Sequence, residues 1–342
     1  MFSWLWRTAL LLVTLVAIAC AGVYVQLTNP MKIEKATHFY VQPGATGSKI
    51  GQQLSEQGWI MNPILVRFAL KLNPQWVPKV GKYQLEPGMT LLSALALFDS
   101  GKAIQYQVTL VEGKTTQDYI KALALKGNVT MTLVGLSNSQ IASQLDLKVD
   151  HAEGQFFANT YTYNEGDTDK SILLQANKKL EDVLSQYWLK HDKKLPYKNA
   201  QESLIMASIV EKETGAQVER PLIAGVFVNR LNRNMRLQTD PTVIYGLGDT
   251  YDGNIRRKHL KQKTPYNTYR IYGLPPTPIA NVGEDAIKAA LNPQKTKALY
   301  FVARGDGTHI FSNTLKQHNA AVAKYQRFQR RKDYQSTPTQ AK

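Results

Sequence analysis

The uncharged apolar run near the N-terminus constrains this chain most. No residue from Thr8 to Met31 carries a charge, and "ALLLVTLVAIACAGVYV" is almost wholly apolar. A run of this length can cross a bilayer as a helix. Three aromatic residues suit the two membrane interfaces: Trp4, Trp6 and Tyr24. Because Arg7 precedes the run, the sequence predicts a cytoplasmic N-terminus at 1–7, a single-pass transmembrane anchor at 8–27, and the rest of the chain outside the cytoplasm.

Two other interpretations of this run stay open. Ala17 and Ala19 form an A-x-A pattern typical of a cleaved signal peptide, but apolar residues follow it where a mature protein would begin with polar ones. Cys20 ends "AIAC", which faintly resembles a bacterial lipoprotein box, so acylation of Cys20 is an alternative form of anchoring. As the single cysteine, Cys20 cannot form an intramolecular disulfide.

Composition and charge limit the classes of protein. The 342 residues include 43% hydrophobic and 20% charged residues, a globular composition long enough for two or three folded units. The net charge of +16 favours a polyanionic partner such as nucleic acid, anionic lipid or an acidic cell-wall polymer. No nucleic-acid-binding motif accompanies the charge, so nucleic acid is not expected as a partner.

A strand, glycine turn and helix recur after the anchor. The three copies read "HFYVQPGATGSKIGQQLSEQGWI", "GKYQLEPGMTLLSALALFDSG" and "YQVTLVEGKTTQDYIKALALKG". Thr90 and Thr115 are suited to cap the helices of the second and third copies. Compact strand–helix units of this kind fit either a spacer scaffold or a glycan-binding module of the LysM type. On the second interpretation, the LysM-like module covers residues 38–110.

The remainder predicts a mixed α+β fold. Residues 111–197 are expected to connect the small module to a catalytic region at 198–332, and 333–342 form a polar tail. Within the catalytic region, the patterns indicate helices at "ESLIMASIVEKETG" and "RPLIAGVFVNRLNRN", and a hairpin "LYFVARGDGTHIFS" that turns at Gly305–Gly307. A final helix, "LKQHNAAVAKYQRFQRR", follows the hairpin. The expected fold class is therefore α+β throughout.

The helix at 202–214 carries two glutamates, and helical geometry separates them. At about 100° per residue, Glu213 shares a face with Ile209 and Met206, whereas Glu211 lies nearly opposite. A carboxyl group beside apolar side chains has a raised pKa and can hold a proton near neutral pH, as the helix-borne glutamate of lysozyme does. Such a group can protonate a leaving oxygen in glycosidic cleavage. The alternative is that both glutamates are a solvated helix end paired with Lys212 or Arg220.

Two loop-rich segments supply directional polar groups for a polyhydroxylated, acetamido-bearing ligand. They contain the residues Arg236, Gln238, Thr239, Asp240, Tyr266, Asn267 and Tyr269. Long loops of this kind are usually functional. Motifs for a serine nucleophile, a P-loop or a zinc site are absent from the sequence, so no metal or cofactor is expected. His309 and His318 have a poor spacing for a metal and are interpreted as structural.

Four segments together resemble one known family. They are "MASIVEKET", "VFVNRLNRNMRLQTDPTVIYGLG", "TPYNTYRIYGLPPTPIANVG" and "LYFVARGDGTHIFSNTLKQHN". In this order and spacing they are similar to the endolytic murein transglycosylases, the YceG-like proteins of the bacterial inner membrane. The resemblance covers roughly residues 38–330. Relatives carry a Glu-Gly-x-x-x-Pro-Asp-Thr motif where this chain has Ala158 and Asn159, so an acid at position 159 has no role here.

The resemblance implies a lytic transglycosylase and its site residues. Such an enzyme cuts the β-1,4 bond between N-acetylmuramic acid and N-acetylglucosamine in nascent peptidoglycan, leaves a 1,6-anhydro end and terminates strand elongation. Glu213 matches the family's catalytic glutamate. Glu211 and Arg236 are expected to hold the site residues in place without contacting the substrate. Gln238 and the pair Tyr266–Asn267 resemble residues that line the saccharide cleft of lytic transglycosylases. The polar loops themselves add Thr239, Asp240 and Tyr269 as predicted substrate-binding residues. The implied location is the inner membrane, with the catalytic part periplasmic and penicillin-binding proteins of wall elongation as partners.

Three alternatives to this function remain from the sequence. The chain could be a non-catalytic peptidoglycan-binding anchor in the membrane. It could be a scaffold that recruits wall synthases. It could also be a muramidase that hydrolyses the bond with Asp240 as second carboxylate, although Asp240 before Pro241 is also suited to a turn or helix cap.

Overall fold

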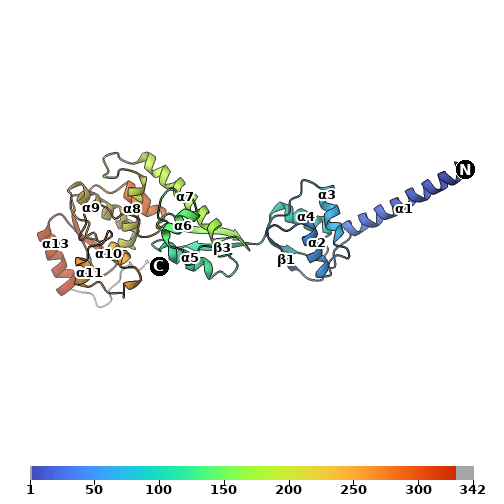
Figure 1. Cartoon of the computed structure of the whole chain (residues 1–342). Coiled ribbons are helices and arrows are strands. Elements are labelled where there is room, and N and C mark those ends of the chain that lie inside the picture. Colours follow the sequence, from blue (N-terminus) through green and yellow to red (C-terminus); the bar gives the residue numbers. More distant parts are fainter. Residues whose placement is uncertain (1, 329–342) are drawn as a thin grey trace. The chain divides into compact units, whose positions relative to one another are not determined.

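The computed structural model describes residues 2–328, with side chains from Trp6 onward. Trp4 and the predicted tail at 333–342 therefore lie outside the described side chains and residues. The chain divides into two compact units, each described by itself here (Figure 1). Unit 1 comprises Met1–Gln107, Asn128–Thr130 and Thr162–Asp167, and unit 2 comprises the remaining residues.

Unit 1 begins with the long helix α1 (Phe2–Thr28). The part Trp6–Thr28 is long and apolar enough to cross a membrane, by length and composition. The helix continues through both ends of the predicted span at 8–27. Beyond the helix, Met31 and Ile33 are buried together with Leu27. Residues between the predicted anchor and the predicted module at 38–110 therefore contribute apolar side chains to the core of unit 1.

The rest of unit 1 has the element order β-α-α-β-α. The elements are β1 (Thr37–Val41), α2 (Gly47–Glu56), α3 (Ile64–Leu72), β2 (Gly81–Leu85) and α4 (Leu91–Ser100). Strands β1 and β2 pair antiparallel, with Phe39 opposite Tyr83. Their rings meet Phe98 of α4 at centroid distances of 5.3 and 4.9 Å, which forms an aromatic core. Thr46 and Thr90 cap the helices that follow the two strands, as the repeat pattern predicts for Thr90.

The third predicted copy of the repeat forms as expected but is divided. Strand β3 (Gln105–Leu110) pairs with β4 (Asn159–Asn164), and each strand begins in one unit and ends in the other. The helix of this copy, α5 (Thr116–Ala124), is capped by Thr115 and belongs to unit 2. Most of the region 111–197, expected as a separate connection, thus belongs to the same compact unit as the region after it. Its side chains Phe156 and Leu173 are fully buried there, which explains the union.

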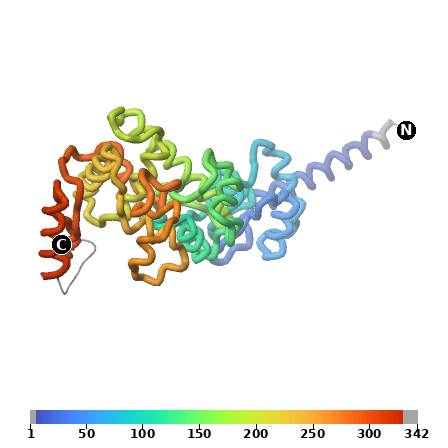
Figure 2. Tube along the Cα trace, turned by 60° about the vertical axis from the view of Figure 1, so that its left-hand side comes forward, coloured from blue at the N-terminus to red at the C-terminus, as the bar shows by residue number. Residues whose placement is uncertain are grey.

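Unit 2 is mainly helical. After α5 it contains α6 (Asn138–Gln144), α7 (Asp169–Lys190), α8 (Ala200–Glu213), η1 (Gln217–Glu219), α9 (Arg220–Asn232), α10 (Asp240–Leu247), η2 (Gly248–Thr250), α11 (Arg257–Lys261), α12 (Glu284–Leu291), the hairpin β5 (Tyr300–Ala303) and β6 (His309–Ser312), α13 (Leu315–Val322) and η3 (Ala323–Phe328). The hairpin turns through Gly305 and Gly307, both at positive φ, as predicted. Helix α13 lies beside the hairpin near the end of the described chain (Figure 2).

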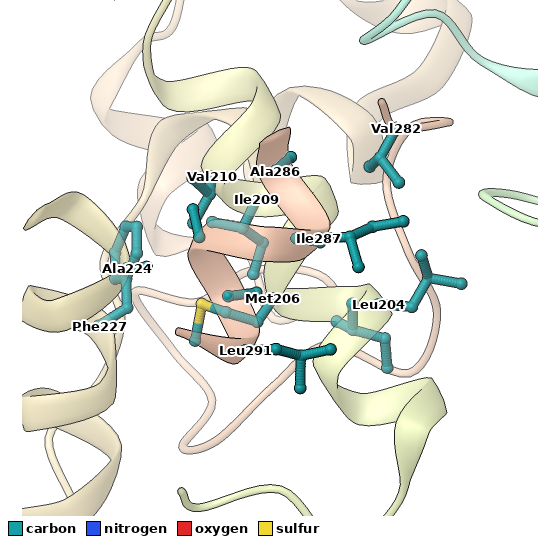
Figure 3. Packing of buried hydrophobic residues seen from close by; sticks show 14 of the residues in the cluster. Leu204, Met206, Ile209, Val210, Ala224, Phe227, Val282, Ala286, Ile287 and Leu291 are labelled. Carbon is teal, nitrogen blue, oxygen red and sulfur yellow. The ribbon is translucent and has the colours of Figure 1, made fainter. Parts of the chain in front are cut away.

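Helix α8 is the centre of unit 2. Its residues from Ser203 to Glu211 are all buried, because neighbouring helices cover it on several sides. Figure 3 shows Met206 and Ile209 of α8 packed among side chains of α9 and α12. A helix buried on most faces holds its ends rigidly, which fixes the side chain at its last residue, Glu213.

Candidate functional site

The C-terminal end of α8 opens into a cavity of ≈ 530 Å³ within unit 2. Glu213, the last residue of α8, is half-buried on its wall. The other walls come from α9, the segment before α10, the loop at Tyr269, the hairpin and α13. Polar side chains on these walls include those of Arg230, Gln238, Thr239, Asp240, Tyr269, His318 and Asn319. Segments far apart in the sequence therefore meet around one carboxyl group.

Burial controls the protonation of Glu213. Loss of solvation raises its pKa to about 7, and the negative charge of Asp240 adds to the rise. A hydrogen bond donated by the Thr239 hydroxyl to Oε1 and the positive charge of Arg230 act in the opposite direction. The carboxyl group is consequently a mixture of protonated and ionised forms near neutral pH. A group in this state can both donate and accept a proton.

The segment around Thr239 is held in place by Thr268. The backbone N–H groups of Gln238 and Thr239 donate to the Thr268 carbonyl (3.2 Å) and hydroxyl (3.0 Å). Gln238 itself has a positive φ of 52°, an uncommon conformation for a residue with a side chain. The two threonines are almost fully buried. Thr239 is therefore a fixed donor to Glu213.

Arg230 of α9 supplies a buried positive charge to the same cavity. Its Nε donates to the Leu299 carbonyl at 2.7 Å, and its Nη1 donates to the Leu237 carbonyl at 2.8 Å. The guanidinium also lies over the Tyr300 ring, 5.0 Å from the centroid. These hydrogen bonds to backbone carbonyls offset part of the desolvation cost of burying Arg230. Its positive charge still acts on the cavity.

Asp240 and Tyr269 form a pair on the cavity wall. The Tyr269 hydroxyl donates to Oδ1 of Asp240 at 2.6 Å. Asp240 is also the first residue of α10, where a negative charge is favourable beside the helix N-terminus. These contacts agree with the predicted alternative that Asp240 stabilises the start of a helix, although the residue still lines the cavity.

Glu211 faces a different part of unit 2. Its carboxylate forms an ion pair with Arg220 at 2.6 Å, and it accepts a weak hydrogen bond from the Gly283 N–H at 3.4 Å. Burial nevertheless raises the pKa of Glu211 to about 6, with Arg220 opposing the rise. The helical phase thus separates the two glutamates as predicted. The pairing with Arg220 foreseen for a solvated helix end applies to Glu211 alone, and in a buried setting.

Three predicted residues lie outside the lining of the Glu213 cavity. Tyr266 shares a hydrogen bond with the Thr277 hydroxyl at 2.8 Å. Asn267 is buried, and its amide donates to the carbonyls of His259, Leu260 and Gln262 around α11. Arg236 lies over the Tyr272 ring, 4.7 Å from the centroid. For Tyr266 and Asn267 a role in binding stays a prediction.

Sequence reasoning missed several cavity residues, above all Arg230, Tyr300 and Asn319. Arg230 had no local signal, since charged residues are rarely buried unless paired, and its partners are backbone carbonyls of distant segments. His318, interpreted as structural, lines the cavity, stacks on Tyr300 at 5.2 Å and has a pKa lowered by burial. His309 instead contacts Glu219 at 2.7 Å, in keeping with the structural interpretation.

Sequence reasoning also missed Glu153. This residue is buried in unit 2 and accepts hydrogen bonds from the backbone N–H of Thr116 (3.0 Å) and the Tyr245 hydroxyl (3.3 Å). Burial raises its pKa to about 7. Glu153 does not line the cavity of Glu213, and its contacts connect α5 to α10. Within residues 2–328 no group of three His, Cys, Asp or Glu side chains could hold a metal ion.

The geometry defines a class of site. An α+β protein presents one half-protonated glutamate, a fixed hydroxyl donor and a buried guanidinium in an open cavity lined mostly by polar groups. Such an arrangement is suited to general acid–base chemistry by a single carboxyl group on a polar substrate.

Comparisons with known proteins identify the family. A sequence model described as the YceG-like family matches residues 39–324, so the chain belongs to this family. It is 32% identical to the endolytic murein transglycosylase of Bacillus subtilis (strain 168), over 87% of this chain and 88% of that protein. It is 28% identical to the endolytic murein transglycosylase of Streptococcus pneumoniae (strain D39), over 83% of this chain and 57% of that protein.

A solved structure is also similar. The crystal structure of a putative yceG-like protein from Listeria monocytogenes matches 84% of this chain and 100% of that chain, with a TM-score of 0.52 and 30% sequence identity. The resemblance seen in the sequence motifs is therefore confirmed at the level of the family.

Proposed function

We propose that this protein is an endolytic murein transglycosylase. It cleaves the β-1,4 bond between N-acetylmuramic acid and N-acetylglucosamine within nascent glycan strands, leaves 1,6-anhydro-muramic ends and so terminates strand elongation. The names of the relatives support the activity. The observation that carries the proposal in this chain is Glu213, a cavity-lining carboxyl group with a pKa of about 7.

In the proposed first step, protonated Glu213 donates its proton to the glycosidic oxygen. The bond from this oxygen to the muramic anomeric carbon breaks, and the electron pair stays with the departing sugar. The acetamido carbonyl of the muramic residue supports the positive charge that develops at the anomeric carbon, so no second enzyme carboxylate is needed. Gln238 and Tyr269, both on the cavity wall, orient the acetamido group and the sugar.

In the second step, ionised Glu213 removes the proton from the muramic 6-hydroxyl. The hydroxyl oxygen attacks the anomeric carbon and closes the anhydro ring, which returns the proton to Glu213. The hydrogen bond from Thr239 and the charge of Arg230 stabilise the ionised form between the two steps. One carboxyl group thus acts as acid and then as base.

Asp240 supports a second candidate function. It lines the same cavity as Glu213, so it could activate a water molecule and produce a muramidase that hydrolyses the bond. We favour the transglycosylase because Asp240 already accepts the Tyr269 hydroxyl at 2.6 Å at the start of α10. A glycan-binding anchor or a synthase-recruiting scaffold without catalysis is the remaining alternative.

Mass spectrometry of digested, uncrosslinked glycan strands separates these functions. The proposal predicts products that end in 1,6-anhydro-muramic acid. Reducing muramic ends would instead favour the hydrolase, and uncut strands would favour the non-catalytic anchor or scaffold.

The proposed location is the bacterial inner membrane. The apolar part of α1, Trp6–Thr28, would be a single-pass anchor, with the catalytic unit in the periplasm beside the growing wall. Penicillin-binding proteins of wall elongation are the proposed partners. For the compact strands and helices from β1 to α4 we propose a LysM-like role in glycan binding.

A further inference from the structure

A second cavity of ≈ 520 Å³ lies in unit 2 at the opposite half of α8 from Glu213. Its walls are the N-terminal part of α8, Leu231 at the end of α9, and the loop from Tyr272 to Pro276. None of the proposed catalytic steps uses it. We propose that this cavity is a distal subsite that binds sugar residues of the same glycan strand that is cut at Glu213. This inference rests on the proposed function.

The chemistry of its walls fits a neutral saccharide. The Tyr272 side chain lines the cavity and is 58% exposed, so its ring is accessible to a ligand there. The Arg236 guanidinium lies 4.7 Å from the ring centroid, which holds the ring in place on one side. Tyr272 is therefore a fixed aromatic surface on which the apolar face of a pyranose ring can stack.

Besides Tyr272, the polar side chains of the cavity are those of Lys198, Asn199, Gln201 and Glu202. The carboxylate of Glu202 accepts the backbone N–H of Lys198 at 2.7 Å. The amides of Gln201 and Asn199 line the cavity as donors and acceptors for hydroxyl and acetamido groups. Lys198 and Glu202 carry opposite charges, so the cavity has no net charge that would select a charged stem peptide over a neutral sugar. The glycan is therefore the better match.

Helix α8 also sets the position of this cavity relative to the first. Glu202 and Glu213 are eleven residues apart on one straight helix, which corresponds to about 16 Å along its axis. Eleven residues also bring the side chain back to within about 20° of the same face. The two cavities are thus separated along α8 by a distance that a strand of several sugars can span. Because Met206 and Ile209 on the intervening face are buried, the strand would have to pass over the segment that joins α9 to α10.

One short segment, residues 230–238, contributes side chains to both cavities. Arg230 lines the first cavity and Leu231 lines the second. Arg236, which holds Tyr272, precedes the first-cavity residue Gln238 by two positions. A strand that extends from Glu213 across this short segment reaches Tyr272. Binding away from the cut would favour long strands over short fragments, which is what cleavage inside a strand requires.

Binding measurements with the full chain in detergent micelles test this proposal. The parent protein is Glu213→Gln, so that bound strands stay intact, and the ligand is uncrosslinked glycan freed of stem peptides. Tyr272→Ala in this parent is expected to weaken binding of long strands roughly fivefold to tenfold, as truncation of an aromatic anchor does. It should leave unchanged the binding of fragments too short to reach from Glu213 to Tyr272.

Two control variants make the result specific. Tyr272→Phe keeps the ring and is expected to bind long strands nearly as well as the parent. Tyr251→Ala removes a half-exposed tyrosine that lines neither cavity, and binding should not change. The proposal is overturned if Tyr272→Ala binds long strands as tightly as the parent, if it weakens short fragments equally, or if binding requires the stem peptides. Cleavage that persists in Glu213→Gln would count against the proposed function alone, since the Tyr272 comparison measures binding.

Discussion

Two glutamates on one helix differ in their surroundings and therefore in their chemistry. Glu211 has a buried cation, Arg220, at 2.6 Å, so its ionised form is compensated locally. Glu213 has a hydroxyl donor, Thr239, and only the more distant charge of Arg230. The second arrangement leaves protonation finely balanced near neutral pH, which is what a group that must both give and take a proton needs.

The pH dependence of cleavage tests this balance. Because the first step needs protonated Glu213, whose pKa is about 7, kcat/KM is expected to fall as pH rises through this value. Thr239→Val removes the hydrogen bond that lowers this pKa. The fall in kcat/KM should therefore move to higher pH, by up to about one unit. A profile that stays in place, or moves to lower pH, would show that Thr239 does not tune the acid.

Sequence reasoning could separate Glu213 from Glu211 because the relevant physics is local. Helical phase depends only on residue spacing, so it distinguished Glu213 from Glu211 before any packing was known. The positions of Arg230 and Tyr300 depend on how α9 and the hairpin meet, and no local pattern encodes that meeting. The same limit applies to Asn267: its polarity suggested a ligand, whereas folding turns its amide to the carbonyls around α11.

At the scale of elements, Arg220 joins three helices. Besides Glu211 at the end of α8, it contacts Glu112 at 3.5 Å and Asp285 of α12 at 3.8 Å. The guanidinium is almost fully buried, with 5% of its side chain exposed. It therefore neutralises three carboxylates that would otherwise repel one another where α8, α9 and α12 meet.

Replacement of Arg220 should destabilise unit 2 in a pH-dependent way. Arg220→Gln leaves Glu211 buried without its cation, which is expected to cost about 3–5 kcal/mol when Glu211 is ionised. The pKa of Glu211, already about 6, would rise further. At pH values below the ordinary pKa of a glutamate, Glu211 is protonated and the cost disappears. The loss of stability should therefore be small at low pH and grow as pH rises through the raised pKa of Glu211.

Thermal unfolding of wild type and Arg220→Gln at pH 5 and pH 8 measures this effect. A second substitution, Glu211→Gln, should recover most of the stability at the higher pH because no buried charge is left unpaired. The two remaining carboxylates, Glu112 and Asp285, are about half exposed to solvent. An equal loss at both pH values, or no recovery, would mean that Arg220 stabilises the junction through packing rather than charge.

Gly154 lies in close contact with Pro278 in unit 2, at a position where a side chain would not fit. It has a φ of +75°, and an added Cβ would lie 2.3 Å from the Pro278 Cβ. Gly154→Ala should therefore lower the unfolding free energy by clearly more than the about 1–2 kcal/mol of an unfavourable left-handed backbone. Gly127→Ala is a matched control, since Gly127 has a φ of +73° and open space around it. Equal losses in denaturant titrations of the two variants would contradict the close contact.

The elements that the sequence predicted best are those with their own local signals. The strand, turn and helix copies have capping threonines and glycines, and all three form as expected. The tract from Met235 to Val282 has no such periodicity. Its conformation is held by contacts with residues far away in the sequence, such as the hydrogen bond from the Ile279 N–H to the Ser208 hydroxyl at 3.0 Å. Only the structure could reveal those contacts.

At the scale of the whole chain, the proposed anchor helix continues into the core of unit 1 at the end of the apolar run. Leu27, Met31 and Ile33 are each no more than 6% exposed within the core of unit 1. The boundary expected near residue 38 therefore misses part of that core. Hydropathy alone could not show this, because membrane-facing and core-facing apolar residues look alike in a sequence.

Two truncations test this arrangement. A chain that starts at Gln26 should lose its association with lipid vesicles in a flotation assay, while unit 1 keeps its stability. A chain that starts at Lys32 also loses Leu27 and Met31, and the stability of unit 1 should fall by about 3 kcal/mol or more. Flotation of the Gln26 chain, or equal stability of the two truncations, would contradict the proposed division between anchor and core.

The most direct test of the proposed function is the digestion of nascent, uncrosslinked glycan strands by three proteins: wild type, Glu213→Gln and Glu211→Gln. Mass spectrometry then counts the 1,6-anhydro ends that each produces. We expect Glu213→Gln to form them roughly 10²- to 10⁴-fold more slowly than wild type, as loss of a general acid and base does. Glu211→Gln should retain most of the activity. If Glu211→Gln abolishes anhydro ends and Glu213→Gln does not, the assignment of Glu213 as acid and base is wrong.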